Sequence, residues 1–169
     1  LLAGAAITPL PAQQQVVPGS NVNMVSGTTF PDGDPYLQRQ NEPSSAVSTR
    51  NPSHILGGSN DYRTVDLPGP LDPIRGEKMH ADAWAGLFKS FDGGQTWKST
   101  LLPGYPQDTS AAGLASPIHG RHAATDAVVR AGTNGMFYYA GLAFDRGDNA
   151  PRTIFVGRYM DLDNLEGRD

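Results

Sequence analysis

The chain has 169 residues, 38% hydrophobic and 8% aromatic, which is enough for one ordinary domain. Its 13 basic and 17 acidic residues give a formal net charge of -4 without a basic run, which argues against nucleic acid or an anionic membrane as partner. The absence of cysteine excludes disulfides, thiolate catalysis and cysteine-ligated zinc, while 20 Gly and 14 Pro favour turn-rich β structure over long helices.

The first twelve residues predict export from the cell. Residues 1–10 are an apolar stretch, and Pro11-Ala12 then leads into three glutamines, a pattern typical of the end of a secretory signal. We therefore expect residues 1–12 to be a signal remnant, the true start to lie upstream, and the protein to be secreted, periplasmic or at the cell surface. The alternative is an apolar first strand of a mature domain, because the stretch is too short to span a bilayer.

Residues 13–40 are rich in Gln, Pro, Gly, Ser and Asn without a sustained period, which predicts a linker. After them, short β-forming runs alternate with Gly, Pro and Asn turns. The runs cover residues 45–48, 54–58, 84–90, 96–101, 127–131, 136–144 and 153–159. No window shows a helical period over three turns, so we expect an all-β fold. Phe137, Tyr138, Tyr139 and Phe144 fall inside one run, which favours sheet core over a sugar-stacking platform.

Two parts of the chain resemble each other. A unit that opens at Asn41 and one that opens at Thr125 each continue into a turn and then into a second apolar run. Glu42 and Asp126 occupy the same position in these units. Repeated sheet units are typical of propellers and solenoids, because one sheet cannot bury both of its faces without neighbours.

Residues 90–97 form the strongest local motif. They match the pattern Ser-x-Asp-x-Gly-x-Thr-Trp at Ser90, Asp92, Gly94, Thr96 and Trp97. The pattern predicts a hairpin in which the carboxylate accepts backbone hydrogen bonds and the glycines adopt positive φ. We expect the indole to pack between adjacent sheets, and we interpret all five residues as structural.

This octapeptide resembles the Asp box of bacterial neuraminidase repeats, and residues 41–160 resemble the sialidase-like propellers that carry it. The resemblance implies a partial β-propeller of about one and a half to two four-stranded antiparallel blades with long loops. The first blade would cover 41–102 and hold a long loop at 61–81, a second loop would cover 103–124, and an incomplete second blade 125–169. Family members close a complete ring, so the chain would be an N-terminal fragment.

The function implied by the resemblance is that of a sialidase-like glycoside hydrolase, acting on or binding extracellular glycans. Family members hold the substrate carboxylate with three arginines, but the Arg-Ile-Pro motif of the first blade is absent, residues 62–64 and 72–75 being the nearest candidates. The alternative is a non-catalytic propeller that serves as a binding or cell-surface scaffold. In either case, remaining blades or another chain would have to cover the open sheet edges.

Glu42 and Asp126 are the candidate catalytic residues, because the start of each innermost strand faces the central channel of such a propeller. Two acids that converge there could act as acid and base or bind a cation. The alternative is that each caps its strand and faces water. Arg63 and Arg121 are candidate substrate-binding residues, because a guanidinium binds a carboxylate through two parallel hydrogen bonds.

Metal sites receive weaker support from the sequence. His119 and His122 lie near Asp126, but their loose spacing favours loop histidines in solvent over zinc ligands. The acidic segments 32–34 and 161–166 lack the calcium-binding loop with its central glycine, and we interpret them as turns. We therefore expect no metal and no cofactor, with surface calcium as the alternative.

Overall fold

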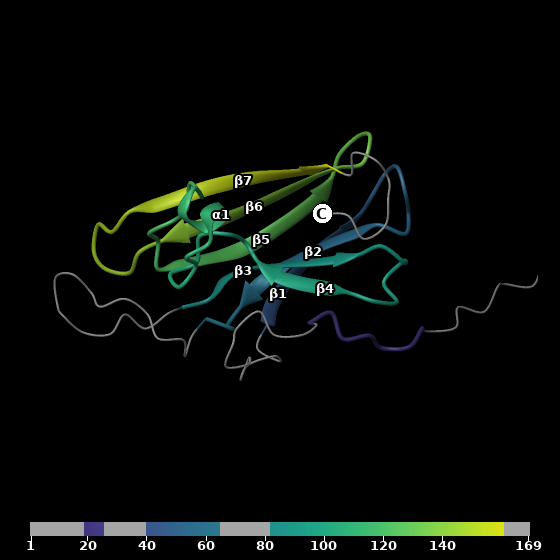
Figure 1. Ribbon diagram of the computed structural model, residues 1–169, viewed down its shortest axis with the longest axis horizontal. Coiled ribbons are helices and arrows are strands. Elements are labelled where there is room, and N and C mark those ends of the chain that lie inside the picture. Colours follow the sequence, from purple (N-terminus) through teal and green to yellow (C-terminus); the bar gives the residue numbers. More distant parts are fainter. Residues whose placement is uncertain (1–18, 26–39, 65–81, 161–169) are drawn as a thin grey trace, which may run out of the picture.

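The structure is a computed structural model that describes residues 19–25, 40–64 and 82–160 (Figure 1). These residues form two antiparallel sheets and one short helix, so the predicted all-β class is confirmed. The first sheet contains β1 (Gln40–Val47), β2 (Ile55–Asp61), β3 (Trp84–Ser90) and β4 (Lys98–Leu101), in chain order. The second sheet contains β5 (Ala123–Ala131), β6 (Met136–Phe144) and β7 (Arg152–Met160), also in chain order. Each predicted β run overlaps one of these strands.

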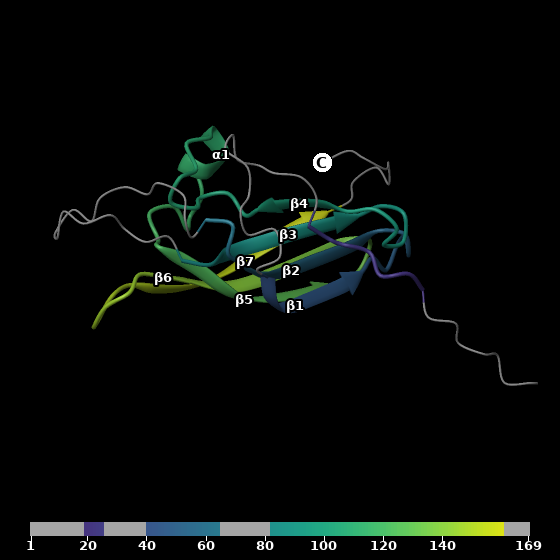
Figure 2. The same ribbon diagram turned by 90° about the horizontal axis from the view of Figure 1, so that it is seen from below.

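The two sheets pack face to face with their strand ends aligned. Near one end the backbone N–H of Ala124 donates to the carbonyl of Ala83 at 3.0 Å, and near the other the Thr49 hydroxyl donates to the carbonyl of Gly132 at 2.6 Å. We call the end where β1 and β5 begin the Glu42 end. The opposite end, where β3 leads into the hairpin at 91–97, is the Asp-box end. Figures 1 and 2 show α1 at the Glu42 end, away from that hairpin.

β2 is the central strand of the packing, because side chains approach both of its faces. A Cβ on Gly58 would lie 2.6 Å from Cε2 of Tyr139 in the second sheet. A Cβ on Gly57 would lie 2.9 Å from Cε of Met24, which belongs to the segment 19–25. Adjacent glycines therefore let β2 run closely between two layers, where larger residues would push the layers apart.

The core lies between the sheets, where β5 packs against β1, β2 and β3. Buried apolar side chains of both sheets form one continuous cluster there. It contains Leu56, Trp84, Ala85, Leu87, Leu101, Leu102, Ile118, Ala124, Ala127, Val129, Phe137, Tyr139 and Ala143. Non-directional burial of this apolar surface, rather than any single contact, holds the two sheets together.

The β6 strand corrects one prediction from the sequence. Phe137 and Tyr139 are in the core as expected, but Tyr138 is 41% exposed on the opposite face. Successive side chains of a strand point to opposite faces, so a continuous aromatic run cannot place all of its rings in one core. The expectation that Tyr138 is sheet core is therefore wrong.

The connection between the sheets contains a helix that the sequence did not predict. α1 (Ala111–Leu114) begins after Ser110, whose hydroxyl accepts a hydrogen bond from the N–H of Gly113 at 3.0 Å. One helical turn is too short to leave a periodic signal. In the described part of the chain, no helix is long and apolar enough to cross a membrane. The predicted signal remnant 1–12 and most of the predicted linker 13–40 and loop 61–81 lie outside the described residues.

Candidate functional site

The four predicted site residues all lie at the Glu42 end. Glu42 and Asp126 are near the starts of β1 and β5, Arg63 follows the end of β2, and Arg121 precedes β5. Neighbouring strands are antiparallel, so strands that begin at this end lie beside strands that end there. The fold therefore brings to one edge residues that are far apart in the sequence.

Glu42 and Asp126 occupy matching irregularities in the two sheets. The pairing of β1 with β2 shifts between Asn41 and Ser44, and that of β5 with β6 shifts between Thr125 and Val128. Each bulge contains one acidic residue with positive φ, 53° at Glu42 and 61° at Asp126. Such a bulge redirects a side chain out of the regular alternation. Both carboxylates are solvent-exposed.

Asn60, a residue that the sequence analysis did not select, connects the two bulges. Its side-chain Nδ2 donates to Oε2 of Glu42 at 3.0 Å, and its Oδ1 accepts a hydrogen bond from the backbone N–H of Asp126 at 2.8 Å. The Asn60 side chain is buried, with 5% of its surface exposed. The Asn60 amide therefore holds the bulge of Glu42 and the bulge of Asp126 in a defined position relative to each other.

Arg63 is fully buried inside the first sheet. Its guanidinium lies 2.7 Å from Oδ2 of Asp61, and neither side chain is exposed to solvent. The remaining donors reach Oγ of Ser99 at 3.3 Å and the carbonyl of Thr100 at 3.0 Å, both on β4. Arg63 thus ties the end of β2 to β4, across β3. Binding a substrate carboxylate would require it to leave these partners.

Arg121 is closer to the surface but is also paired. Its guanidinium donates to Oδ2 of Asp145 at 2.9 Å, with 28% of the arginine side chain exposed. The other oxygen of Asp145 accepts from the backbone N–H of His122 at 3.0 Å. Arg121 and Asp145 hold the start of β5 against the end of β6. A guanidinium has five N–H donors, and the hydrogen bond to Asp145 uses one of them.

The Asp box folds as a hairpin turn around its carboxylate. Oδ1 of Asp92 accepts from the N–H of Thr96 at 2.9 Å and from the hydroxyl of Ser90 at 2.9 Å, and Oδ2 accepts from the hydroxyl of Thr96 at 2.5 Å. The side-chain hydrogen bond from Thr96 is the main reason that the pKa of Asp92 is lowered to about 2. Gly93 and Gly94 have φ of 74° and 91°, so the turn needs glycine at both positions.

The indole of the motif is not where the sequence predicted it. Trp97 is half-buried, and its Nε1 donates to the carbonyl of Gly94 at 3.0 Å, so the ring folds back onto its own turn. The core instead holds Trp84, which is 0% exposed and donates from Nε1 to the carbonyl of Leu102 at 2.7 Å. The expectation that Trp97 packs between the two sheets is therefore wrong. The motif fixes the local turn, whereas the packing partner of the ring depends on the whole fold.

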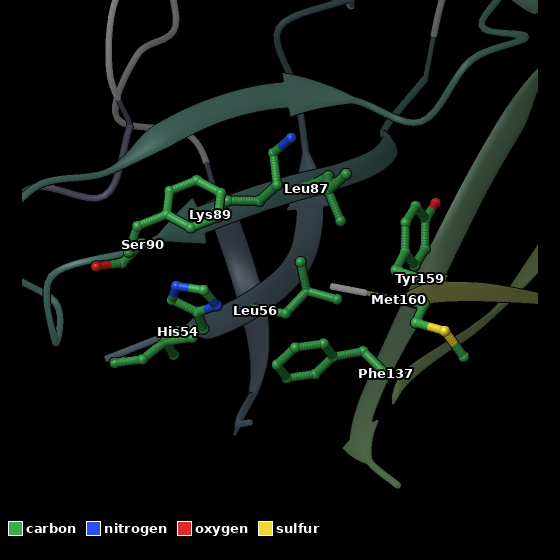
Figure 3. Close-up of a pocket in the computed structure, with 10 residues that line it drawn as sticks. His54, Leu56, Leu87, Lys89, Ser90, Phe137, Tyr159 and Met160 are labelled. Carbon is green, nitrogen blue, oxygen red and sulfur yellow. The ribbon is translucent and has the colours of Figure 1, made fainter. Parts of the chain in front are cut away.

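A groove of about 310 Å³ opens between the sheets at the Asp-box end (Figure 3). Leu56, Phe137 and Tyr159 contribute apolar walls, and His54 and Lys89 contribute polar atoms. The groove shares none of the four site residues predicted at the Glu42 end. Its apolar lining and the exposed carboxylates at the other end are therefore two chemically different surfaces.

The predicted metal alternatives find no support in the described part of the chain. No three or more His, Asp or Glu side chains there are grouped so as to hold a metal ion. His122 Nε2 lies 3.8 Å from Asp145 Oδ1, which is a loose contact with a paired carboxylate. The acidic segments 32–34 and 161–166, and the arginine-containing segment 72–75, lie outside the described residues.

The residues that the sequence analysis missed are polar groups between the sheets. Besides Asn60, Ser44 accepts a hydrogen bond on its hydroxyl from the N–H of Val129 at 2.9 Å. A polar residue at a position where the strand alternation predicts burial is the sequence signal that could have identified both. Comparison of the chain with protein-family models, with curated proteins and with solved structures finds no match.

Proposed function

We propose that the two sheets are consecutive blades of an exported, sialidase-like β-propeller, and that its Glu42 end acts on or binds extracellular glycans. The observation that carries this proposal is the repeated acidic bulge. Glu42 and Asp126 are exposed, stand at equivalent positions of adjacent sheets, and are connected through Asn60. Paired carboxylates on a rigid edge suit hydrogen bonding to sugar hydroxyls and acid–base chemistry at a glycosidic bond.

The blade assignment has independent support in the first sheet. It is a four-stranded antiparallel meander whose outer hairpin has the hydrogen bonds to Asp92 that the sequence motif predicts. The second sheet starts the same meander and lies against the first with aligned ends. Stacked meanders with their innermost strands at one side are the arrangement of propeller blades.

A non-catalytic scaffold is the second candidate, and the two arginines favour it. Arg63 is buried in an ion pair with Asp61, and Arg121 is paired with Asp145. A sialidase needs arginines that are available to the substrate carboxylate. Because Arg63 and Arg121 both pair with acidic residues of the chain, glycan binding without hydrolysis is the simpler interpretation of the Glu42 end.

Glycan-array retention and release of a fluorogenic sialoside together test the proposal. The protein is expressed as these residues and as the complete product of its reading frame, and is compared with the double variant Glu42→Gln/Asp126→Asn. Asp148→Asn, an exposed carboxylate on the β6–β7 loop, is the matched control.

We expect retention of glycans by the wild type and by the control, and loss of retention in the double variant. Release of the fluorophore in addition assigns hydrolysis. Retention without release favours the non-catalytic scaffold. Neither retention nor release by either form of the wild type overturns the glycan proposal.

A further inference from the structure

The face of the second sheet that is turned away from the first sheet carries exposed apolar side chains among the exposed arginines Arg130, Arg152 and Arg158. We call it the outer face. Its exposed apolar residues come from all three strands, with exposed fractions of 41% to 81%: Val128 43%, Tyr138 41%, Ile154 81% and Val156 63%. Exposed apolar side chains that come from neighbouring strands and share one face of a sheet point to an interaction surface.

The contact between the two sheets shows what such a face does in this fold. In the first sheet, Ser44, Gly58 and Leu87 form one cross-strand row, the Ser44 row. Ser44 accepts a hydrogen bond from Val129, Gly58 lies against the ring of Tyr139, and Leu87 is in the shared core. The Ser44 row is therefore part of the interface with the second sheet.

The outer face carries the equivalent row of the second sheet. Counted from the two acidic bulges, Val128, Ala140 and Val156 stand where the Ser44 row stands in the first sheet. Yet Val128 and Val156 are exposed. The Ser44 row is thus covered by the second sheet, whereas the equivalent row of the second sheet is exposed.

A recess that could receive this face exists on the far face of the first sheet, the face turned away from the second sheet. A groove of about 410 Å³ lies there between the segment 19–25 and strands β1 to β3, with Val22, Met24, Pro43 and Phe88 in its lining. Gly57 stands where the second sheet has Tyr139, and the ε-methyl of Met24 lies over it. Met24 thus supplies a side chain to the position from which Tyr139 contacts the first sheet.

We infer that the outer face of the second sheet binds the far face of the first sheet in a second copy of this chain. Ile154 and Val156 project from the outer face, and the groove beside Phe88 offers an apolar recess for such side chains. The contact continues the stacking that already joins the two sheets within one chain. It uses different surfaces on the two copies, so it is head-to-tail and can close a ring or propagate. It goes beyond the proposed function, because it needs no glycan.

Light scattering coupled to size-exclusion chromatography, over a dilution series, tests the inference without any ligand. We expect the wild type to assemble at high concentration into multiples of its 18.0 kDa mass. Ile154→Asp/Val156→Asp should be monomeric with an unchanged circular dichroism spectrum, because both side chains are exposed in the monomer. Leu114→Asp, which changes an apolar side chain that is 59% exposed on α1, should assemble as the wild type does.

A mixing experiment tests the head-to-tail geometry. Val22→Asp places a charge at the groove and leaves the outer face intact. Alone it should be monomeric, and mixed with Ile154→Asp/Val156→Asp it should form a one-to-one complex that does not grow further.

Three results overturn the inference. If the wild type is monomeric at all concentrations, the proposed interface does not exist. If Val22→Asp assembles on its own, the contact is a two-fold contact between two outer faces. The third result is that the 169-residue chain assembles while the complete product of the reading frame is monomeric. The outer face would then be covered by a further sheet of the same chain.

Discussion

Asn60 and Asp126 are 66 residues apart in the sequence, yet the side-chain Oδ1 of Asn60 accepts a hydrogen bond from the backbone N–H of Asp126 at 2.8 Å. A β-bulge leaves its extra residue outside the strand ladder, so this N–H needs a partner from elsewhere. Asn60 provides it from the neighbouring sheet, and its Nδ2 at the same time donates to Glu42. The amide satisfies a donor in one bulge and an acceptor in the other.

Replacing Asn60 by Ala should therefore lower the free energy of unfolding by about 1–3 kcal/mol, because it removes two part-buried hydrogen bonds of about 0.5–1.5 kcal/mol each. Urea denaturation measures the loss, and hydrogen exchange should show reduced protection of the Asp126 amide in particular. Asn41→Ala is the matched control, since Asn41 pairs with Asn60 in the sheet but is exposed. Equal effects of the two substitutions would contradict the assigned role.

The equivalence of Glu42 and Asp126 could be predicted from the sequence, because each bulge is a local feature and the local pattern repeats. The role of Asn60 could not, since its partner belongs to another sheet. The error at Trp97 has the same origin: the octapeptide determines the turn, but the core position is taken by Trp84, at the start of the preceding strand.

The placement of Arg63 did have a local signal. Asp61 lies two residues before it, and its Oδ1 accepts a hydrogen bond from the backbone N–H of Arg63 at 3.0 Å. An acidic residue so close to an arginine at a strand end indicates an internal pair as readily as a substrate clamp. Sequence reasoning had no means to choose, because burial of both side chains depends on the chain around them.

Arg63→Ala should destabilise the protein by about 3–5 kcal/mol, because it leaves the buried Asp61 carboxylate without its partner. Arg63→Lys should restore little, since one ammonium cannot reach Asp61, Ser99 and the Thr100 carbonyl together. Thermal and urea unfolding give the comparison. Arg146→Ala, at an ion pair with Asp82 whose arginine is 70% exposed, should change stability by about 0–1 kcal/mol. A folded Arg63→Ala variant that loses glycan retention alone would instead assign Arg63 to the ligand.

The Asp box should give the protein an acid-sensitive turn. Hydrogen bonds, first that from the Thr96 side chain, lower the pKa of Asp92 from 3.8 to about 2. A carboxyl whose pKa is depressed in the folded state stabilises the fold above its unfolded pKa, and this contribution is lost as the pH falls through the folded pKa. We therefore expect the Asp92 contribution to fade as the pH falls from 3.8 to about 2.

Asp92→Asn isolates that contribution from those of the other carboxyls. The variant should melt at a lower temperature than the wild type at neutral pH, and the difference should shrink as the pH falls from 3.8 to about 2. Circular dichroism melting curves at closely spaced pH values measure it, with Asp148→Asn as the exposed control. If the difference in melting temperature between the wild type and Asp92→Asn stays constant with pH, the Asp92 carboxylate is not responsible for the acid sensitivity.

Gly58 and Tyr139 are the contact on which the spacing of the two sheets depends. The Tyr139 ring is 0% exposed, and its hydroxyl donates to the carbonyl of Gly86 at 2.9 Å. Burial raises the pKa of the Tyr139 hydroxyl, which keeps it a neutral donor. Held in this way, the ring cannot move to make room for a methyl group on Gly58.

Gly58→Ala should therefore cost about 1–3 kcal/mol through overpacking. This outweighs the roughly 0.5–1 kcal/mol that replacing a strand glycine by alanine otherwise gains. Tyr139→Phe should cost about 1 kcal/mol by removing one hydrogen bond while keeping the ring. Tyr139→Leu shortens the side chain, so in combination with Gly58→Ala it should relieve the clash and give a coupling of about 0.5–3 kcal/mol in a double-mutant cycle. Strictly additive urea-denaturation energies would mean that the two residues do not set the distance between the sheets.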